Sequence, residues 1–432
     1  MDFESALLEH LPREEVDALL ASLGQDSVHS FILDVDKCSE ESLLALYPHL
    51  ERHPFLEHVF YYDKKEYDLG KSMLYDLGAI SIQDSASMLA PHYLDPKPGE
   101  RVLDLCAAPG GKTIFAALRM KKTGLIVSND LSYPRAKALS QNIERMGIGN
   151  AVVTNDDFEA VYKDYLEQFD CVLLDAPCSG SAMFRKNKEA EEDWSYEKVL
   201  RCAEIQSKLL QIAYAVLRKG GRLLYSTCSF SKEENEDNVL SFIANHDDMH
   251  LVDIEQNPCY FRPKAAPEAI YLFPHRYKGE GQFMALFTKD GEGSVVREAK
   301  SKSEKTSKEL QAFLQKFHLE NLQISKKGET TYGIALPIEA KRLHILRYGI
   351  EIGADGKFFL PSHALARCLP STLAIPLSKE ETLKYLQGET FPSKGEDGFQ
   401  LVAYEKMTLG WVKIVNGMAK NHYPKGLRYR YQ

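Results

Sequence analysis

The sequence lacks the features that mark several classes of protein. No apolar run approaches the roughly 18 residues of a membrane-spanning helix, so we expect no membrane partner. The opening residues, MDFESALLEHLPREE, are charged and contain no apolar segment, so we also expect no signal peptide. The eight cysteines include no CxxC pair and no Cys/His cluster at zinc spacing, which predicts neither a disulfide framework nor a metal site. A reducing cytoplasm is the expected compartment.

An excess of positive charge is also missing, because 53 lysines and arginines face 62 aspartates and glutamates, for a net charge of −9. Phosphate binding favours a basic surface, so the average charge weighs against a nucleic-acid partner. Net charge hides local clusters, however. One basic stretch is FRKNK at 184–188, and another is the acid-free segment from Lys413 onward, whose cations and tyrosines are Lys413, Lys420, Lys425, Arg428, Arg430, Tyr423, Tyr429 and Tyr431. This mixture is typical of an RNA surface, with a solvated basic tail as the alternative.

Composition divides the chain into three blocks and a linker. We expect an N-terminal domain at residues 1–75, a larger domain at 76–290 and a C-terminal region at 309–432. Between the last two, residues 291–308 read GEGSVVREAKSKSEKTSK, which is polar and Ser-rich as in a linker.

The two outer blocks show weaker periodicity than the middle one. Helical patterns at 4–23 and 40–49 flank a strand-like stretch at 29–35, which predicts a small α+β domain. The C-terminal region contains short strand-like pieces between Gly and Asp turns and predicts a small, mixed or mostly β module; these pieces are 330–336, 357–361, 400–405 and 410–415.

The middle block predicts an α/β domain of the Rossmann-like kind. Apolar, strand-like stretches recur at 101–105, 125–128, 151–154, 171–174 and 222–225. Helical stretches separate them at 113–121, 133–146, 159–168 and 196–217. Strands that alternate with helices form a parallel sheet with right-handed crossovers, and ligands bind outside the carboxyl ends of its strands.

Each predicted strand of this block is followed by polar residues that could serve a reaction. After the first comes the turn Pro109-Gly110-Gly111, which lets a ligand approach the backbone and the start of the next helix. Asp130 follows the second strand, where a carboxylate is placed to accept ribose hydroxyls. The residues after the other strands are Asp156 and Asp157, then Asp175 and Cys178, then Ser226, Cys228 and Ser229.

The segment Gly111-Lys112-Thr113 also resembles the end of a nucleotide-binding P-loop. That motif needs a glycine five residues before Gly111, where this chain has Cys106. Pro109 also removes one of the backbone donors on which a phosphate cradle depends. A nucleotide hydrolase is therefore the weaker interpretation.

Two of the strand ends carry a cysteine, which indicates covalent chemistry on a pyrimidine. Carbon 5 of the ring is a poor nucleophile, but a thiolate that adds to carbon 6 makes carbon 5 enamine-like and able to accept a methyl group. The negative charge that develops on the ring can be neutralised by a carboxylic acid at N3, and Asp175 supplies such an acid. Chemistry alone leaves open whether Cys178 or Cys228 attacks.

These motifs resemble, almost letter for letter, those of the Sun family of RNA cytosine-5 methyltransferases. The matching segments are VLDLCAAPGGKT, DAPCSG and YSTCSF, supported by IQDSASML, EENE and GEGQFMA, and together they span about residues 75–289. The resemblance implies a Rossmann-like core that uses S-adenosylmethionine to methylate carbon 5 of a cytosine in RNA. It also implies that Cys228 is the nucleophile, that Cys178 assists product release, and that Asp175 borders both the base and the cofactor.

The resemblance implies a set of cofactor-binding residues as well. Asp130 would hold the ribose, and Asp157, favoured over Asp156 by counting from Asn150, would lie near the adenine. The remaining residues of the predicted set are Arg135, Asp175 and the turn made of Cys106, Ala107, Ala108, Pro109, Gly110, Gly111 and Lys112.

The C-terminal segment GWVKIVNGMAKNHYPKGLR resembles the RsmF-type bacterial branch, which modifies 16S ribosomal RNA and carries a PUA-like module. We therefore expect 16S RNA or the small ribosomal subunit as partner, and a monomeric enzyme. Arg185 and Lys186 are candidate RNA contacts. A truncation near Ser301 is expected to lower RNA affinity and to leave cofactor binding nearly intact. The resemblance implies that the N-terminal domain at 1–75 and the C-terminal region at 309–432 both bind RNA. The chain departs from the family by lacking Arg-x-Asn near its first strand and by having Ser181-Ala182 where many members have Glu-Gly.

Two other functions stay open on the sequence. One is a methyltransferase that acts on DNA or on a small molecule, which the extra flanking domains and the basic tail disfavour. The other is a non-catalytic RNA-binding or ribosome-assembly factor on the same fold, which the presence of Asp175, Cys178 and Cys228 together disfavours.

Overall fold

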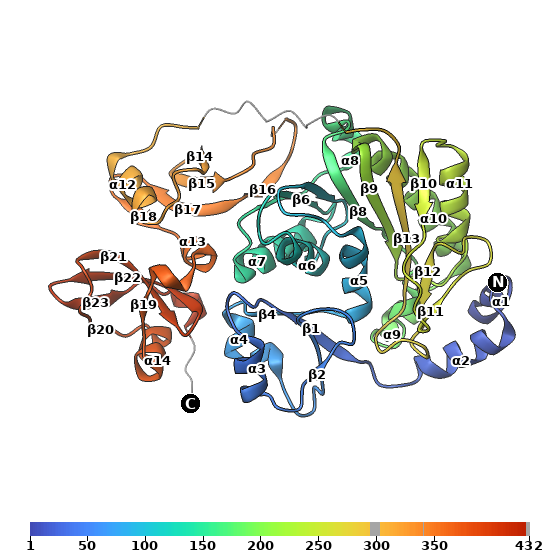
Figure 1. Ribbon diagram of the computed structural model, residues 1–432, viewed down its shortest axis with the longest axis horizontal. Helices are drawn as coiled ribbons and strands as arrows, with labels where there is room; N and C mark the ends of the chain where they lie inside the picture. Colours follow the sequence, from blue (N-terminus) through green and yellow to red (C-terminus); the bar gives the residue numbers. More distant parts are fainter. Residues whose placement is uncertain (294–302, 340, 429–432) are drawn as a thin grey trace.

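The computed structural model describes residues 1–293, 303–339 and 341–428. The chain forms an N-terminal, a large central and a C-terminal part, coloured blue, green to yellow, and orange to red in Figure 1. Part of the predicted linker, 294–302, lies outside the described residues. None of the helices in the described ranges combines the length and apolarity needed to cross a bilayer.

The central part is built on a ten-stranded sheet in the order β11-β12-β13-β9-β8-β5-β6-β7-β16, with β10 paired to β13. Its five parallel strands are β5 (Arg101–Asp104), β6 (Leu125–Asn129), β7 (Ala151–Thr154), β8 (Phe169–Asp175) and β9 (Leu217–Thr227). The antiparallel strands are β10 (Met249–Val252), β11 (Tyr260–Phe261), β12 (Ile270–Leu272), β13 (Gln282–Lys289) and β16 (Ile345–Tyr348). The predicted parallel α/β sheet is confirmed.

Helices bury both faces of this sheet, because successive strand residues point to opposite sides. Val102 and Ile126 pack with α5 (Ser85–Leu94), α6 (Gly111–Arg119) and α7 (Tyr133–Met146). Leu103 and Val127 pack on the other face with α10 (Tyr196–Val216) and α11 (Glu236–Ala244). The apolar strands of the sequence are therefore fully buried, as parallel strands are.

One predicted helix, 159–168, is wrong. The segment forms the four-residue helix α8 (Phe158–Val161) and then the 3-10 helix η2 (Tyr162–Tyr165). Tertiary contacts override the helical pattern here, because Tyr165 is buried and its hydroxyl donates to the carbonyls of Glu339 and Lys341 at 2.9 and 2.6 Å.

The N-terminal part contains four α-helices, a 3-10 helix and a four-stranded sheet. The predicted helix 4–23 is broken into α1 (Phe3–Leu8) and α2 (Arg13–Leu23). Pro12 has no N–H with which to continue a helix, and it stands at the N-cap of α2. The sheet has the order β2-β3-β1-β4, and its strands are β1 (His29–Leu33), β2 (Glu51–Arg52), β3 (Val59–Tyr62) and β4 (Ile80–Ile82). The other helices of this part are α3 (Glu40–Leu46), the 3-10 helix η1 (Leu69–Lys71) and α4 (Met73–Asp76). Because β4 pairs with β1, this sheet reaches beyond residue 75.

The C-terminal part contains two small sheets. The first has the order β14-β15-β17-β18, made of β14 (Gln323–Lys327), β15 (Thr330–Ile334), β17 (Ile350–Asp355) and β18 (Phe359–Pro361) after α12 (Lys308–Lys316). The second has the order β19-β21-β22-β23-β20, made of β19 (Ile375–Pro376), β20 (Phe391–Pro392), β21 (Gly398–Tyr404), β22 (Met407–Val415) and β23 (Met418–Asn421), with α13 (His363–Cys368) and α14 (Lys379–Gln387). All four strand-like pieces of the sequence lie on strands.

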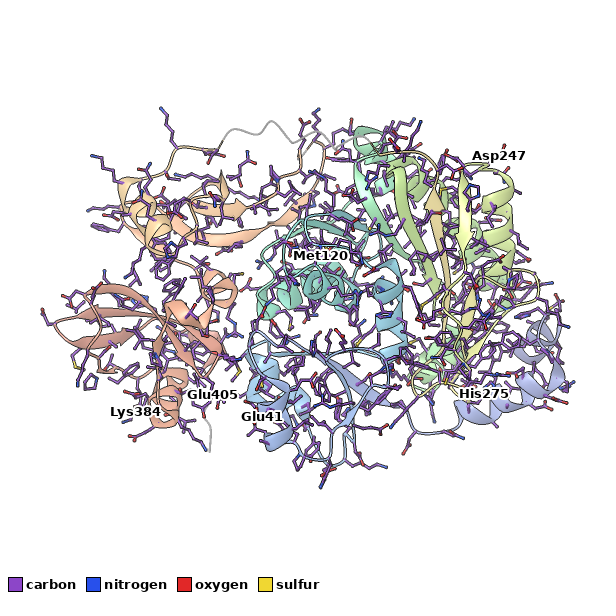
Figure 2. The ribbon with its side chains drawn as sticks, in the orientation of Figure 1. Glu41, Met120, Asp247, His275, Lys384 and Glu405 are labelled. Carbon is purple, nitrogen blue, oxygen red and sulfur yellow. The ribbon has the colours of Figure 1, made fainter. Side chains whose placement is uncertain are left out.

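The C-terminal part shares its packing with the rest of the chain. Strand β16 extends the central sheet by pairing with β7, and one apolar cluster joins N-terminal residues such as Phe31 to C-terminal ones such as Tyr385. The Arg367 guanidinium bridges the two, donating to the carbonyls of Asp76 and Thr408 at 3.2 and 2.7 Å. Figure 2 labels Glu405, in the β21–β22 turn, on the side of the C-terminal part next to α3.

Removing residues 302–432 is therefore expected to destabilise the remaining chain, in contrast to the expectation from the sequence. The truncation strips β16 from the sheet edge and exposes apolar residues of the shared cluster, each worth about 1.5–3 kcal/mol when buried. We expect the melting temperature to fall by at least about 5 °C. The control is a full-length chain with a protease site inserted at 294–302. After cleavage, its two pieces should elute together in gel filtration; pieces that separate and keep their melting temperature would contradict a shared core.

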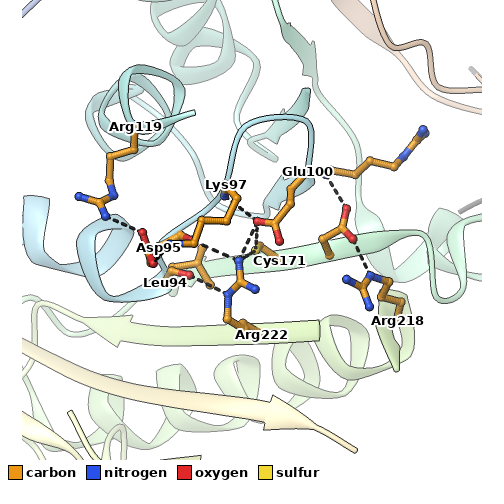
Figure 3. Close-up of polar contacts among 10 residues, drawn as sticks. Leu94, Asp95, Lys97, Glu100, Arg119, Cys171, Arg218 and Arg222 are labelled. Atoms are coloured by element: carbon orange, nitrogen blue, oxygen red, sulfur yellow. Dashed lines mark hydrogen bonds and ion pairs between the residues drawn. The ribbon is translucent and has the colours of Figure 1, made fainter. Parts of the chain in front are cut away.

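Ion pairs fasten the amino ends of the central strands (Figure 3). Arg222 on β9 donates to Glu100, just before β5, at 2.7 Å and to Cys171 on β8 at 3.0 Å. Arg218 donates to Asp170 at 2.5 Å, which joins the starts of β9 and β8. At the opposite end, Asp104 and Asp130 are buried carboxylates that each keep one oxygen without a hydrogen-bond partner among the described residues.

Candidate active site

The candidate site lies at the carboxyl ends of the parallel strands, where the strand order reverses. β6 and β7 lie to one side of β5, and β8 and β9 lie to the other. A ligand crevice is expected at such a reversal. Asp104 ends β5 and Asp175 ends β8, and both residues line a cavity at this point.

The larger of two cavities, which we call the Asp130 cavity, measures about 770 Å³. Its lining includes seven predicted site residues, Cys106, Asp130, Arg135, Asp157, Asp175, Cys178 and Cys228, and an apolar group, Leu105, Leu131, Phe158, Ile205, Leu209 and Ile212. The Asp130 carboxylate is only 3% exposed; one oxygen accepts from the Ser132 N–H at 2.9 Å. The other, Oδ2, accepts no hydrogen bond from any described residue, and Arg135 Nη2 lies 3.3 Å from it.

The smaller cavity, which we call the Lys112 cavity, measures about 340 Å³. Its lining includes the predicted residues Cys106, Ala107, Ala108, Pro109, Gly111, Lys112, Asp175 and Cys228. Gln83 and Asp104 also line it, and each carries a buried oxygen without a hydrogen-bond partner among the described residues. Burial raises the pKa of Asp104 to about 7, against the opposing effect of the Thr113 hydroxyl bond. The two cavities share Cys106, Asp175 and Cys228, which therefore stand at their junction.

Gly110 is the one predicted residue that lines neither cavity. Its φ of 107° lies in the left-handed region, and its N–H donates to the Ala107 carbonyl at 2.8 Å. A Cβ at this position would lie 2.8 Å from Leu139 Cδ1 on α7, so any side chain would have to displace Leu139 as well as adopt a strained backbone conformation. Gly110 shapes the loop that other residues of the set line.

Three donors hold the Asp175 carboxylate. Lys112 Nζ donates to Oδ2 at 2.7 Å, and Ser226 Oγ and Gln282 Nε2 donate to Oδ1 at 2.7 and 3.0 Å. Burial disfavours the charge of Lys112, but the adjoining Asp175 carboxylate more than offsets this and raises the pKa of Lys112. The ammonium and the carboxylate therefore form a fixed pair at the cavity junction.

Cys178 and Cys228 are brought together although 50 residues separate them, with their sulfur atoms 3.0 Å apart. Contact with the Cys228 sulfur and burial raise the pKa of the Cys178 thiol well above its ordinary range. Both residues line the Asp130 cavity, and Cys228 also lines the Lys112 cavity. The arrangement offers one sulfur that is reachable from both sides and a second that keeps its proton.

The structure separates the two neighbouring acids after β7. Both carboxylate oxygens of Asp156 accept from the His344 N–H, at 3.0 and 3.1 Å, so this residue connects β7 to the chain just before β16. Asp157 is exposed, caps α8 by accepting from the Glu159 N–H at 3.1 Å, and lines the Asp130 cavity. Asp156 lines this cavity as well, but both of its oxygens are held, whereas the contacts among the described residues hold only one oxygen of Asp157, so Asp157 is the better candidate to face a ligand.

Two of the suggested RNA contacts are corrected. The side chain of Arg185 is only 3% exposed, because it donates to Glu280 Oε2 at 2.8 Å and to the Gly279 carbonyl at 2.7 Å. Lys186 remains at the rim of the Lys112 cavity. In the C-terminal segment Tyr423 is a core residue, with its ring edge-on to His363 and tilted against Tyr385. Tyr429, Arg430 and Tyr431 lie outside the described residues.

Sequence reasoning missed four residues of the site. Asp104, Ser226 and Gln282 stood inside quoted motifs without a predicted role, and Gln83 stood in the supporting match IQDSASML. Burial is what distinguishes them, and only the fold reveals it. Among the described residues, no three His, Cys, Asp or Glu side chains gather in a group that could hold a metal ion.

Comparisons with known proteins identify the family and the fold. Residues 91–288 match the family described as "16S rRNA methyltransferase RsmB/F", and residues 372–429 match the "Methyltransferase RsmF PUA domain", which confirms the predicted PUA-like module. A methyltransferase homologue from Pyrococcus horikoshii is 27% identical, with a TM-score of 0.58 over 66% of this chain and 93% of that one. NSun6 from the same organism, solved with SFG, is 21% identical with a TM-score of 0.60 over 67% of this chain and 98% of that one, a likeness of fold.

The sequence relatives match most of the chain. The "Ribosomal RNA small subunit methyltransferase F" of Shewanella loihica is 30% identical over 395 residues, which covers 83% of this chain and 79% of that protein. The protein of the same name from Vibrio atlanticus is 31% identical over 457 residues, which covers 98% of this chain and 95% of that protein, so the match extends over all three parts. The chain belongs to the 16S rRNA methyltransferase RsmB/F family, in the branch of small subunit methyltransferase F, and is an rRNA methyltransferase.

Proposed function

We propose that this protein transfers the methyl group of S-adenosylmethionine to carbon 5 of a cytosine in 16S ribosomal RNA, through a covalent bond between Cys228 and carbon 6. The observation that carries the proposal is the junction of the two cavities, where Cys228 and Asp175 meet beside Cys106. The methyl donor and the cytosine have to come into contact for the transfer, and the junction of the two cavities brings Cys228 and the Lys112–Asp175 pair to such a place.

The unpartnered oxygens fit S-adenosylmethionine as the cofactor. Asp130 Oδ2 in one cavity would accept from ribose hydroxyls, and the apolar lining near Phe158 would cover the adenine. Asp104 Oδ1 and Gln83 Oε1 in the other would accept from the ammonium of the methionine end. The NSun6 structure of similar fold was solved with SFG, an analogue of S-adenosylmethionine, which supports the same class of ligand. When bound, the cofactor supplies the methyl group.

The residues at the junction have distinct roles in the proposed reaction. The Cys228 thiolate forms a bond to carbon 6, and the electron pair of the ring double bond moves toward carbon 5 and N3. The Lys112–Asp175 pair stabilises this charge at N3 by hydrogen bonding. After carbon 5 has gained the methyl group, a base removes its proton, the double bond re-forms, and the Cys228 sulfur leaves with its electron pair. Cys178, in contact with that sulfur, assists this release.

Bisulfite sequencing of 16S ribosomal RNA tests the proposal directly. Cells that express the protein should contain one or more protected cytosines, which are lost when the gene is deleted and return with the wild-type protein but not with Cys228→Ala. Methyl incorporation into DNA or small metabolites instead of RNA would refute the proposed substrate.

Asp130→Ala should weaken S-adenosylmethionine binding by about 1.5–3 kcal/mol, because it removes a buried, charged acceptor for ribose hydroxyls. Calorimetry with the purified protein measures the change. Glu159→Ala is the matched control, since it removes an exposed acid from the rim of the same cavity. Equal dissociation constants for the two variants would remove Asp130 from the site.

A further inference from the structure

Glu234 is a buried carboxylate for which the proposed mechanism gives no role. It lies between β9 and α11 and has no exposed surface. No lysine, arginine or histidine in the described part of the chain pairs with it. Burial raises the pKa of Glu234, and the hydrogen bonds that it receives work in the opposite direction. Burying an acid without a cation costs free energy, so an apolar side chain would serve better if filling space were the only requirement.

The hydrogen bonds of Glu234 join the two cysteine loops. Oε1 accepts from the Ser179 N–H at 2.7 Å, and Oε2 accepts from the hydroxyls of Ser179 and Ser229, each at 2.5 Å. Ser179 directly follows Cys178, and Ser229 directly follows Cys228. One carboxylate thus connects the residues next to both sulfur atoms. We call Glu234, Ser179 and Ser229, joined by these hydrogen bonds, the clamp.

A second set of contacts keeps this clamp in place. Gln206 on α10 donates to Glu234 Oε1 at 3.0 Å and to the Pro177 carbonyl at 2.9 Å. The Tyr225 hydroxyl donates to the Glu234 carbonyl oxygen. Other bonds also join the loops, including Ala182 N–H to the Cys228 carbonyl at 3.0 Å, so the loops are not held by Glu234 alone.

The geometry points to Glu234 as a positioning residue for methyl transfer, which holds the Cys178 and Cys228 loops so that both sulfur atoms reach the same base. The inference rests on the proposed function, because it needs both cysteines at the reaction centre. The negative charge of Glu234 also helps to raise the pKa of the Cys178 thiol, which favours the protonated form of the sulfur that does not attack. A small displacement of either loop would misalign a reaction that depends on two sulfurs.

Glu234→Gln tests this role, with Glu233→Gln as the matched control. Glu233 is the neighbouring acid of the same motif, but it accepts from Tyr196 outside the clamp. We expect Glu234→Gln to lower kcat about 100-fold, with the KM for RNA, the S-adenosylmethionine dissociation constant and the melting temperature unchanged. Ser229→Ala removes one donor of the clamp and should lower kcat in the same way, by about 10-fold. Glu233→Gln should behave like the wild type.

Two outcomes would overturn the inference. One is a wild-type kcat for both Glu234→Gln and Ser229→Ala. The other is a fall in kcat that is matched by a fall in cofactor affinity and melting temperature, as a purely structural residue would give. Wild type and Cys228→Ala are assayed alongside: if wild type methylates RNA without a Cys228 adduct, the proposed function fails and this inference with it. If the Cys228 adduct forms, but Glu234→Gln and Ser229→Ala keep the wild-type kcat, this inference fails and the proposed function stands.

Discussion

Replacing Cys178 with alanine is expected to leave the protein covalently joined to its RNA. The variant keeps Cys228, so the sulfur still bonds carbon 6 and the methyl group is still transferred. Release is slow, because the thiol that touches the Cys228 sulfur at 3.0 Å and holds its proton is missing. Cys228→Ala should abolish methyl transfer, since nothing else activates carbon 5. A denaturing gel with radiolabelled RNA should show a strong shifted band for Cys178→Ala alone.

The double variant is the control for this result. Cys178→Ala with Cys228→Ala should give no shifted band, because the bond requires the Cys228 sulfur. A band in Cys228→Ala and none in Cys178→Ala would reverse the two roles. If neither single variant traps RNA and activity follows stability, the thiols only fill space.

The central parallel sheet could be predicted from the sequence, because the pattern that marks each strand lies within a single short segment. Parallel strands such as β5 and β8 are buried on both faces, so they read as short apolar runs, and the polar residues after them fall at one edge by topology. The motif residues Asp130, Asp175 and Cys228 could be proposed on that basis together with the family resemblance. Gly110 could not be separated from its neighbours, because only the packing against α7 shows that it shapes the turn.

What the sequence could not predict depends on contacts between distant segments. Nothing in residues 345–348 indicates an edge strand of the central sheet, and nothing in Tyr423 distinguishes a core ring from an RNA-stacking ring. The contacts of Cys178 with Cys228, of Glu234 with Ser179 and of Arg185 with Glu280 likewise join segments 50, 55 and 95 residues apart. Partners at such separations leave no periodic pattern in the chain, so the clamp and the corrected RNA contacts required the fold.

The ion pair at the cavity junction should behave as one catalytic unit. Lys112 and Asp175 are joined at 2.7 Å, and in the proposed mechanism the carboxylate holds the ammonium where charge develops on the ring. Lys112→Met removes a charge-stabilising donor, and Asp175→Asn removes the carboxylate that positions it, so each should lower kcat by about 100- to 1,000-fold. The rates are measured at a saturating concentration of S-adenosylmethionine, which is chosen for each variant from the dissociation constant that calorimetry gives. Lys208→Met, an exposed lysine on the rim of the Asp130 cavity, is the control and should keep its activity.

The double variant tests whether the pair is one unit or two independent contributors. Each single change leaves the partner without the group that holds it, so the second change has little left to remove. Lys112→Met with Asp175→Asn should therefore be no slower than about the slower single variant. Multiplied losses in the double variant would mean that the two groups act separately, with Lys112 serving the cofactor and Asp175 the base. In that case, the dissociation constant of S-adenosylmethionine should rise in Lys112→Met and stay at the wild-type value in Asp175→Asn.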